Sequence, residues 1–440
     1  MRVGMITLGC AKNTVDTEIM LGDLQARGYR FTDQPADANV LIVNTCGFIE
    51  AAKQESIDTI LEMAQWKEEG CCQALIVTGC LTQRYGAEIL EEIPEVDAVL
   101  GTGTFGQLSA VIDRVLQGER VLLVADPSYD YDTVTSRLRV TPRGSAYVKI
   151  AEGCDHRCAY CAIPLIRGPY RSRSRESIVQ EVSRLAAEGV QEINLIAQDT
   201  TRYGLDRYGR LELTALLQEL LKIDGPAWYR LLYLYPTFFN EELLDLIARQ
   251  ERVLDYLDLP LQHISPRILR DMQRPDDPDS IRRLLYRVRE RVSDITLRTA
   301  FIVGFPGETD DDVAMLADFM REIQFDHVGV FTYSQEEGTL AASRPDQIPE
   351  AAKEERRDFL MREQQPISLA RNRRYIGRTI EVLVEKRWPA GDGVIGRGRK
   401  DAPEVDGLVY VRGTDAAPGK IIPCDVQEAQ EYDLLGVLHK

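Results

Sequence analysis

The stretch of sequence that decides the fold reads Gly153-Cys154-Asp155-His156-Arg157-Cys158-Ala159-Tyr160-Cys161. Its three cysteines are spaced C-x3-C-x2-C, and they follow a strand-like run at residues 146–151. Three closely spaced thiolates in one short loop can wrap a single cluster of iron and sulfide. No fourth cysteine follows nearby, so one iron would lack a protein ligand, and an open position is what a catalytic metal needs. We therefore interpret Cys154, Cys158 and Cys161 as the ligands of a catalytic iron–sulfur cluster.

Three other interpretations of this loop compete with that one. A ferredoxin uses C-x2-C-x2-C-x3-C-P, and the first spacing here differs. A zinc site needs a fourth ligand, which only His156 inside the run offers, and such sites commonly present C-x2-C pairs. The last alternative is three unrelated buried cysteines, which the density of thiols in one turn disfavours.

The region around the loop, residues 143–375, alternates strand-like runs with helical patterns. The strand candidates are residues 146–151, 192–197, 229–234, 256–259, 296–303 and 327–333. Six such units predict an α/β fold with a partial (β/α)6 barrel rather than the closed eight-stranded one. Ligand sites are expected at the C-terminal ends of the strands.

Residues 1–125 show a second alternation, which predicts an open parallel βαβ sheet. Strands are expected at residues 3–8, 40–43 and 74–78, and helices at 14–27, 48–69 and 83–92. Cys10, Cys46 and Cys80 each follow one of these strands directly. Because the carboxyl ends of parallel strands share one edge of a sheet, the three thiols should converge and hold a second, auxiliary cluster. The alternative is three small residues buried independently.

The remaining segments are simpler. Residues 126–142 are polar and rich in turn residues, which predicts a linker. In residues 376–440, five short strands at 378–385, 394–399, 408–412, 420–424 and 432–438 predict a small antiparallel barrel of OB-like character. The other cysteines, Cys71, Cys72 and Cys424, are interpreted as structural.

Bulk composition restricts the class of partner and the compartment. Asp and Glu number 70 against 53 Lys and Arg, giving a net charge of −17, which disfavours a simple nucleic-acid binder. No apolar run has the ~20 residues of a spanning helix, and no signal-peptide pattern precedes the first strand. We expect a cytoplasmic protein, in which the 9 cysteines stay reduced and serve metal or redox chemistry.

The cysteine loop, placed after the first barrel strand, resembles that of the radical S-adenosylmethionine (SAM) superfamily. The resemblance implies that the open iron chelates SAM and that electron transfer then yields a 5′-deoxyadenosyl radical. It also implies a set of SAM-contacting candidates: Tyr160, Gln198, Asp199, Gln262, Arg298, Gly304 and Gly307. Gln198 and Asp199 stand where the superfamily usually has a Gly-Glu pair. The basic run Arg167, Arg171, Arg173 and Arg175 offers carboxylate contacts, although most of it is expected to be a solvated or ion-paired surface.

With its two cysteine triads, the whole chain resembles the methylthiotransferase family, whose C-terminal barrel is called TRAM and binds substrate. Three segments are similar to the RimO-type subgroup, which modifies an aspartate of small-subunit ribosomal protein S-twelve. They are Leu8-Gly9-Cys10-Ala11-Lys12-Asn13, Asp155-His156-Arg157 and Asp401-Ala402-Pro403-Glu404-Val405-Asp406-Gly407. Residues 376–440 hold 9 Lys and Arg against 11 Asp and Glu, a net charge of −2, whereas a tRNA-gripping domain should be basic.

That resemblance implies two 4Fe-4S clusters, with SAM used once as methyl donor and once as radical source. The adenosyl radical would take hydrogen from the aspartate β-carbon, which then receives a methylthio group. The expected partners are the ribosomal protein or the assembled small subunit and an external electron donor, without a membrane and without tRNA as substrate. The alternatives are a tRNA adenosine methylthiotransferase and a non-catalytic cluster carrier or electron-transfer protein.

Overall fold

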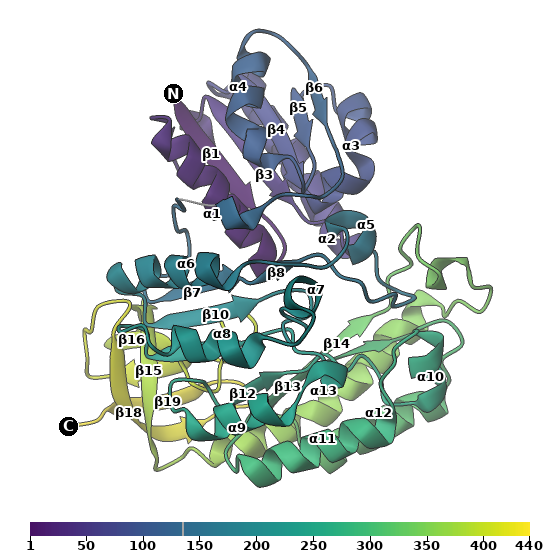
Figure 1. Ribbon diagram of the computed structural model, residues 1–440, viewed down its shortest axis with the longest axis vertical. Helices are drawn as coiled ribbons and strands as arrows, with labels where there is room; N and C mark the ends of the chain where they lie inside the picture. The colour runs from purple at the N-terminus through teal and green to yellow at the C-terminus, as the bar shows by residue number, and fades with distance from the viewer. Residues whose placement is uncertain (134–135) are drawn as a thin grey trace. The chain divides into compact units, whose positions relative to one another are not determined.

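The structure, a computed structural model, describes residues 1–133 and 136–440 (Figure 1). Two units divide them, and neither is continuous in sequence. Unit 1 comprises Met1–Val140, Glu152–Arg173 and Ser334–Ala342. Unit 2 comprises Thr141–Ala151, Ser174–Tyr333 and Ser343–Lys440. Both cysteine triads therefore belong to unit 1, whereas the strands of the central barrel and the whole C-terminal region belong to unit 2.

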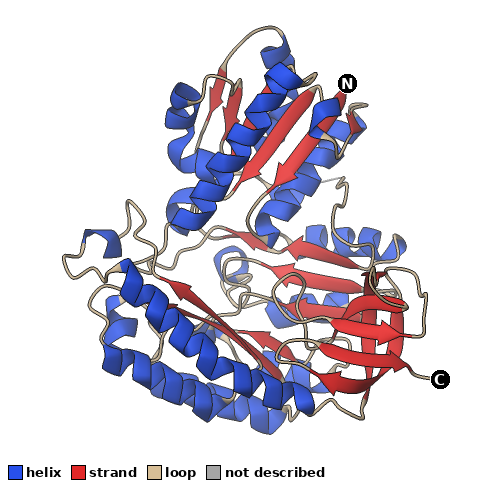
Figure 2. Cartoon of the chain, turned by 180° about the vertical axis from the view of Figure 1, so that it is seen from behind, coloured by secondary structure: helices blue, strands red, loops and turns tan. Residues whose placement is uncertain are grey.

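Unit 1 is built on a six-stranded, all-parallel sheet with helices on both faces (Figures 1 and 2). The strand order is β2-β1-β3-β4-β5-β6, so the predicted open parallel sheet is confirmed. The strands are β1 (Arg2–Thr7), β2 (Arg30–Phe31), β3 (Val40–Thr45), β4 (Ala74–Gly79), β5 (Ala98–Leu100) and β6 (Val121–Leu123). The helices are α1 (Ala11–Ala26), α2 (Glu50–Glu69), α3 (Cys80–Glu92), α4 (Leu108–Leu116) and α5 (Ile163–Arg167). Every residue of β3 and β4 is buried, as expected of central strands covered on both faces.

The described part of the segment predicted as a linker, residues 126–133 and 136–142, is partly packed. It includes one helical turn, η3 (Tyr131–Thr133). The ring of Tyr129 lies 4.2 Å from that of Phe105 and 4.9 Å from that of Tyr131, between centroids. The Tyr131 hydroxyl is buried against the carboxylates of Asp16 and Glu152, at 2.7 and 2.9 Å. Aromatic contacts of this kind fix the segment to unit 1.

Unit 2 contains two three-stranded parallel sheets, β7-β10-β11 and β12-β13-β14, whose strands follow one another in chain order. The strands are β7 (Ser145–Lys149), β10 (Glu192–Ile196), β11 (Trp228–Leu231), β12 (Tyr256–Asp258), β13 (Thr296–Val303) and β14 (His327–Thr332). The helices are α6 (Arg175–Ala187), α7 (Leu205–Tyr208), α8 (Leu213–Leu220), α9 (Glu241–Arg249), α10 (Pro266–Asp271), α11 (Pro278–Arg291), α12 (Asp310–Ile323) and α13 (Glu350–Arg373). Of the two remaining short strands, β9 (Arg171–Ser172) belongs to unit 1, and β8 (Ala151–Glu152) spans the boundary between the units. Six parallel strands in chain order are the predicted partial barrel.

The C-terminal region of unit 2 is a closed five-stranded barrel, in the order β15-β16-β17-β19-β18. Its strands are β15 (Thr379–Arg387), β16 (Gly393–Gly398), β17 (Val409–Arg412), β18 (Ile421–Ala429) and β19 (Leu434–Leu438). Four pairings are antiparallel, whereas β17 and β19 pair in parallel, so the predicted small antiparallel barrel is present with one parallel pair. The reason is parity, because an odd number of strands in a ring cannot alternate direction at every neighbour.

Within unit 2, the loop between β16 and β17 packs against charged groups near the starts of barrel strands. Glu192, the first residue of β10, is fully buried and pairs with Arg230 of β11 and Arg397 of β16. Asp406 accepts hydrogen bonds from the Tyr256 hydroxyl at 2.6 Å and from the Arg298 guanidinium at 3.2 Å. These buried ion pairs attach the small barrel to the larger one. Among the described residues, no helix is both long and apolar enough to cross a membrane.

Candidate functional site

Cys10, Cys46 and Cys80 lie at the carboxyl ends of three neighbouring strands, β1, β3 and β4. The backbone around them is crowded. A Cβ added to Gly9 would lie 2.8 Å from the Cys46 Cβ and 3.1 Å from its sulfur, and one added to Gly47 would lie 2.9 Å from the Cys80 carbonyl carbon. The predicted convergence of the three strand ends is therefore present in the structure.

The thiols of this group act on one another electrostatically. Burial, and after it the neighbouring Cys80 and Cys10, raise the pKa of Cys46 to about 12, while a backbone hydrogen bond of Phe48 and the Arg167 guanidinium oppose the rise. Burial also raises the pKa of Cys80, while the Arg167 guanidinium opposes that shift. Thiolates forced together out of water need a cation, and a bound metal supplies one, since it deprotonates its thiol ligands outright.

Asn13, in the first turn of α1, links the three strand ends. Its Nδ2 donates to the carbonyls of Leu8 and Thr45, both at 2.9 Å, which are two residues before Cys10 and one before Cys46. Its Oδ1 lies 3.5 Å from the Cys80 sulfur, which donates to it. In the sequence, Asn13 is recognisable only as the last residue of the Leu8–Asn13 motif. Its position three residues after Cys10 was the available signal, because i and i+3 share a helix face.

The second group, Cys154, Cys158 and Cys161, lies in a loop that is closed at its base. The amide of Cys154 donates to the carbonyl of Gly168 at 3.0 Å, and that of Cys161 to the carbonyl of Cys158 at 3.1 Å. Gly153 has φ +76°, and a Cβ there would lie 2.1 Å from the carbonyl oxygen of Pro169, so no other residue fits. Cys154 is buried, whereas Cys158 and Cys161 are half-buried. The half-buried Tyr160 lies in the turn between them.

The other SAM candidates belong to unit 2, most of them just after a parallel strand. Gln198 and Asp199 follow β10, and Asp199 is fully buried, accepting hydrogen bonds from the Thr201 hydroxyl at 2.6 Å and the Arg202 amide at 3.2 Å. Asp199 therefore orders its own turn. Gln262 follows β12 with φ +69°, an uncommon angle for a residue with a side chain.

Gly304 and Gly307 begin the loop after β13, and Glu308 holds that loop together. The Glu308 carboxylate accepts from the Gly304 amide at 2.7 Å and from Arg356 at 2.9 Å. Its other oxygen lies 3.3 Å from Nε2 of His263, which is wholly buried. The His263 Nδ1 accepts hydrogen bonds from the backbone amides of Ile264 and Ser265, both at 2.9 Å, which fixes the orientation of the ring. His263 was missed in the sequence because a single histidine carries no spacing signal.

Arg298 is placed differently from the other candidates. It is the third residue of β13, and its guanidinium binds Asp258 at 2.8 Å and Asp406 at 3.2 Å. These carboxylates raise the pKa of Arg298 against the lowering effect of burial. Both contacts attach β13 to neighbouring segments of unit 2, and a role of Arg298 in binding SAM stays a prediction.

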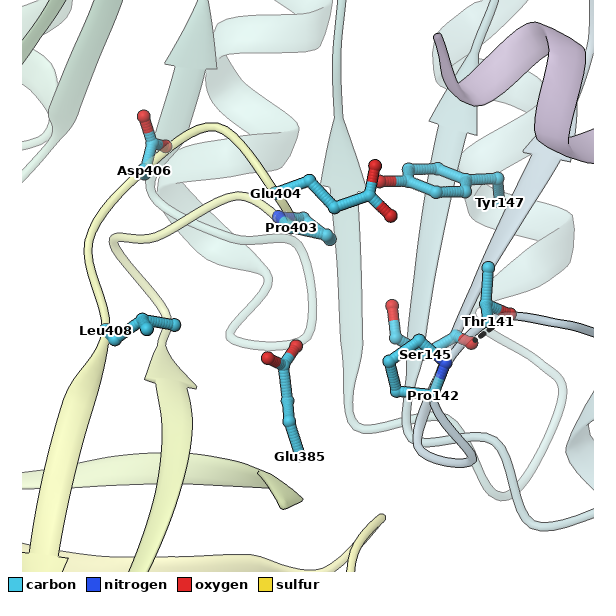
Figure 3. A pocket seen from close by; sticks show the side chains of 9 residues that line it. All are labelled: Thr141, Pro142, Ser145, Tyr147, Glu385, Pro403, Glu404, Asp406 and Leu408. Carbon is cyan, nitrogen blue, oxygen red and sulfur yellow. Dashed lines mark hydrogen bonds between the residues drawn. The ribbon is translucent and has the colours of Figure 1, made fainter. Parts of the chain in front are cut away.

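Unit 2 also contains a cavity of about 220 Å³ beside the start of β7 (Figure 3). Figure 3 shows Glu404 directed towards Tyr147 and Glu385 at the lower side of the cavity. Its lining residues are Thr141, Pro142, Ser145, Tyr147, Glu385, Pro403, Glu404, Asp406 and Leu408. Burial raises the pKa of Glu404, and Glu385 adds to that rise while Arg397 opposes it. The cavity is acidic and lies at the junction of the two barrels.

Comparison with known proteins identifies three family matches along the chain. Residues 2–101 match the uncharacterized protein family UPF0004, residues 148–320 the radical SAM superfamily and residues 376–438 the TRAM domain. The chain is 51% identical to the ribosomal protein uS12 methylthiotransferase RimO of Symbiobacterium thermophilum, over 99% of this chain and 90% of that protein. It is also 51% identical to RimO of Desulforamulus reducens, over 99% of each chain. The chain belongs to the RimO family.

Solved structures with a similar fold are more distant. The radical SAM methyltransferase TsrM of Kitasatospora setae, with cobalamin and a [4Fe-4S] cluster bound, has a TM-score of 0.53 at 16% identity, covering 75% of this chain and 74% of that one. The cobalamin-dependent radical enzyme OxsB has a TM-score of 0.51 at 13% identity, and the match covers 83% of this chain and 56% of that one. At these identities the likeness is one of fold, and it agrees with the partial barrel described above.

The RimO family implies iron–sulfur clusters, and the cysteine groups fit them better than a single ion. Among residues 1–133 and 136–440, no three His, Cys, Asp or Glu side chains are placed to hold one metal ion. Cluster ligands differ from those of one ion, because each thiolate binds a different iron and the sulfurs stay farther apart. The three-thiol composition of each group, the crowding of Gly9 against Cys46 and the shared burial of Cys46 and Cys80 all fit such a cluster.

Proposed function

We propose that this RimO-family protein is a radical SAM methylthiotransferase that attaches a methylthio group to the β-carbon of an aspartate in ribosomal protein uS12. The observation that carries this proposal is the presence of two separate three-cysteine groups in unit 1, on a chain half identical to uS12 methylthiotransferases over its full length. A cluster carrier would need neither the partial barrel nor the C-terminal barrel.

Each cysteine group has its own role in this proposal. Cys154, Cys158 and Cys161 hold the cluster that binds SAM, and Cys10, Cys46 and Cys80 hold the auxiliary cluster. When bound, these clusters supply the electron that cleaves SAM and an iron that carries the transferred sulfur. The chain orients them, since Gly168 fixes the first loop through the Cys154 amide and Asn13 fixes the strand ends of the second group.

The barrel loops of unit 2 are proposed to bind the rest of SAM. Gln198, Gln262, Gly304 and Gly307 all follow barrel strands, at the edge where ligands bind in such folds. The contact of His263 with Glu308 and the salt bridge of Arg356 with Glu308 hold this edge in place. A loop held in advance loses less entropy when it binds a cofactor.

The substrate assignment is supported by charge. The C-terminal barrel, residues 376–440, has a net charge of −2, and carboxylates line the cavity where it meets the central barrel. Phosphate backbones are held by clustered Lys and Arg, whereas a basic protein is attracted to an acidic surface. We therefore propose a protein substrate, docked through the C-terminal barrel, no tRNA substrate, and an external electron donor.

The substrate experiment offers two targets in parallel to the anaerobically reconstituted enzyme. One is purified small ribosomal subunit or isolated uS12, and the other is unmodified tRNA. Mass spectrometry should find a methylthio group on a uS12 aspartate and none on tRNA. Detection of methylthiolated tRNA would be consistent with the proposed radical chemistry but would contradict the proposed protein substrate.

A second experiment tests the two cysteine groups. Replacing Cys154, Cys158 and Cys161 with Ala should remove about half the iron and abolish 5′-deoxyadenosine formation. Replacing Cys10, Cys46 and Cys80 should also remove about half the iron, yet leave some SAM cleavage. Full iron content in the second variant would contradict the auxiliary site.

A further inference from the structure

Arg167 is a buried arginine that joins the two cysteine groups within unit 1. It is the last residue of α5, six positions after Cys161, and its side chain is 2% exposed. The carbonyl of its neighbour Gly168 accepts the Cys154 amide. The guanidinium extends from this loop to residues that carry the other cysteine group.

One edge of the guanidinium is neutralised by carboxylates. Its Nη1 lies 2.6 Å from the Asp16 carboxylate and 3.3 Å from that of Glu152. Both carboxylates are also within hydrogen-bonding distance of the Tyr131 hydroxyl. These two carboxylates pair with the buried charge of Arg167, and removing either partner would leave that charge less compensated.

The other nitrogen has a different set of partners. Nη2 donates to the Cys80 sulfur at 3.3 Å and to Oδ1 of Asn13, the residue that links the three strand ends. Pairing with Asp16 and Glu152 requires only Nη1, so the carboxylates do not account for this contact. A charge-assisted hydrogen bond to a cysteine sulfur is instead a known means of tuning a cluster ligand.

We propose that Arg167 is a positioning residue of the auxiliary cluster, which donates a hydrogen bond to the Cys80 sulfur and thereby raises the reduction potential of that cluster. This inference rests on the proposed auxiliary site. Hydrogen bonds to the sulfurs and nearby positive charge stabilise the more negative, reduced cluster. Asn13, which accepts a hydrogen bond from the same Nη2, donates to the carbonyls of Leu8 and Thr45, shortly before Cys10 and Cys46.

The test uses the full-length chain carrying Cys154→Ala, Cys158→Ala and Cys161→Ala, so that only the auxiliary cluster contributes signal. Arg167→Lys is added, because a lysine keeps the charge beside Asp16 but cannot span to Cys80 as well. We expect retained iron and a tenfold less favourable reduction, a shift of about 59 mV to more negative potential for a one-electron couple. The readout is a redox titration followed by electron paramagnetic resonance.

Arg137→Lys is the matched control, since Arg137 forms a buried pair with Glu18 in the same unit. It should leave the potential unchanged. Arg167→Met provides a second variant, expected to shift the potential at least as far. An unchanged potential in Arg167→Lys with iron retained overturns the role of Arg167 alone. Absence of iron from the triple-alanine parent overturns the auxiliary site itself, so the two failures are distinguishable.

Discussion

Gly9 is held at φ +90° directly beside Cys46, at the point where β1 leads into α1. The left-handed angle alone disfavours any other residue. The closeness of the Cys46 side chain adds a second constraint, because a methyl group at position 9 would overlap Cys46, a proposed cluster ligand. Gly9 therefore supports the position of Cys46, although it has no reactive side chain of its own.

We expect Gly9→Ala to remove about half of the iron per chain, because Cys46 is displaced and one of two clusters is lost. Iron analysis and absorbance of the reconstituted protein provide the measurement. Gly28→Ala is the control, since Gly28 has φ +84° but no atom within 4 Å of an added Cβ. It should cost about 1 kcal/mol of stability and no iron. Full iron in Gly9→Ala would contradict Cys46 as a ligand.

At the scale of single residues, the two cysteine groups could be proposed from the sequence, but the residues that contact them, such as Arg167, could not. Cys10, Cys46 and Cys80 can be found from the sequence because each follows a recognisable strand-like run. Arg167 belongs to a basic run of which most was expected to form a solvated or ion-paired surface, and it is ion-paired but only 2% exposed. Its partners Asp16 and Cys80 lie 151 and 87 positions away, and no local pattern encodes contacts at that separation.

The loop after β13 shows how one element is shaped by another. Gly304 has φ +73°, and a Cβ there would lie 2.2 Å from Cγ of Lys353 in α13. The Lys353 ammonium in turn donates to the carbonyl of Tyr333 at 2.9 Å. The loop is therefore confined between its own strand and α13, and Glu308 closes it from within.

We expect Gly304→Ala to weaken SAM binding about tenfold, a change of roughly 1.4 kcal/mol, because the loop must move away from α13. Equilibrium dialysis with the reconstituted protein measures this affinity, and iron content should be unaffected. Gly189→Ala is matched to it, with φ +85° in the same unit and open space around the added Cβ. Equal SAM affinity in both variants would remove this loop from the proposed cofactor site.

Elements long enough to show a period were predicted well, and short ones were not. The strands at residues 40–43 and 74–78 and all six barrel strands are present within a few residues. The strands β2, β5 and β6, of two or three residues each, were missed. So few residues cannot display alternation, and these strands form because neighbouring strands supply their hydrogen bonds.

On the scale of the whole molecule, the junction of the two barrels in unit 2 depends on Glu192. Burial raises the pKa of this carboxyl, but Arg397 and Arg230 outweigh it and bring the pKa from 4.5 to about 2. A folded-state pKa below the unfolded value stabilises the fold above pH 4.5, and the contribution is lost as pH falls towards 2. At 1.36 kcal/mol per pKa unit, the contribution is about 3 kcal/mol.

Glu192→Gln should therefore lower the free energy of unfolding at pH 7 by about 3 kcal/mol, leaving two buried arginines short of a partner. The difference from the parent should shrink as pH falls below 4.5. Urea unfolding can be followed by the fluorescence of Trp228, which is buried opposite Glu192 in the sheet. Glu219→Gln, at an exposed pair with Lys222, should change stability by no more than ~0.5 kcal/mol. Equal losses of unfolding free energy in the two variants would contradict a stabilising role of Glu192 at the junction.

The division of the chain into two units has a consequence for how such proteins are recombined. The chain passes from one unit to the other at residues 140, 151, 173, 333 and 342, so unit 1 is assembled from three separate stretches. A chimaera that exchanged only residues 1–140 for those of a homologue would leave Arg167 facing a foreign Asp16 and Cys80. A transplanted unit 1 must therefore include residues 152–173 and 334–342 as well as 1–140. Fusing residues 1–140 to another chain end to end would not transfer the whole unit.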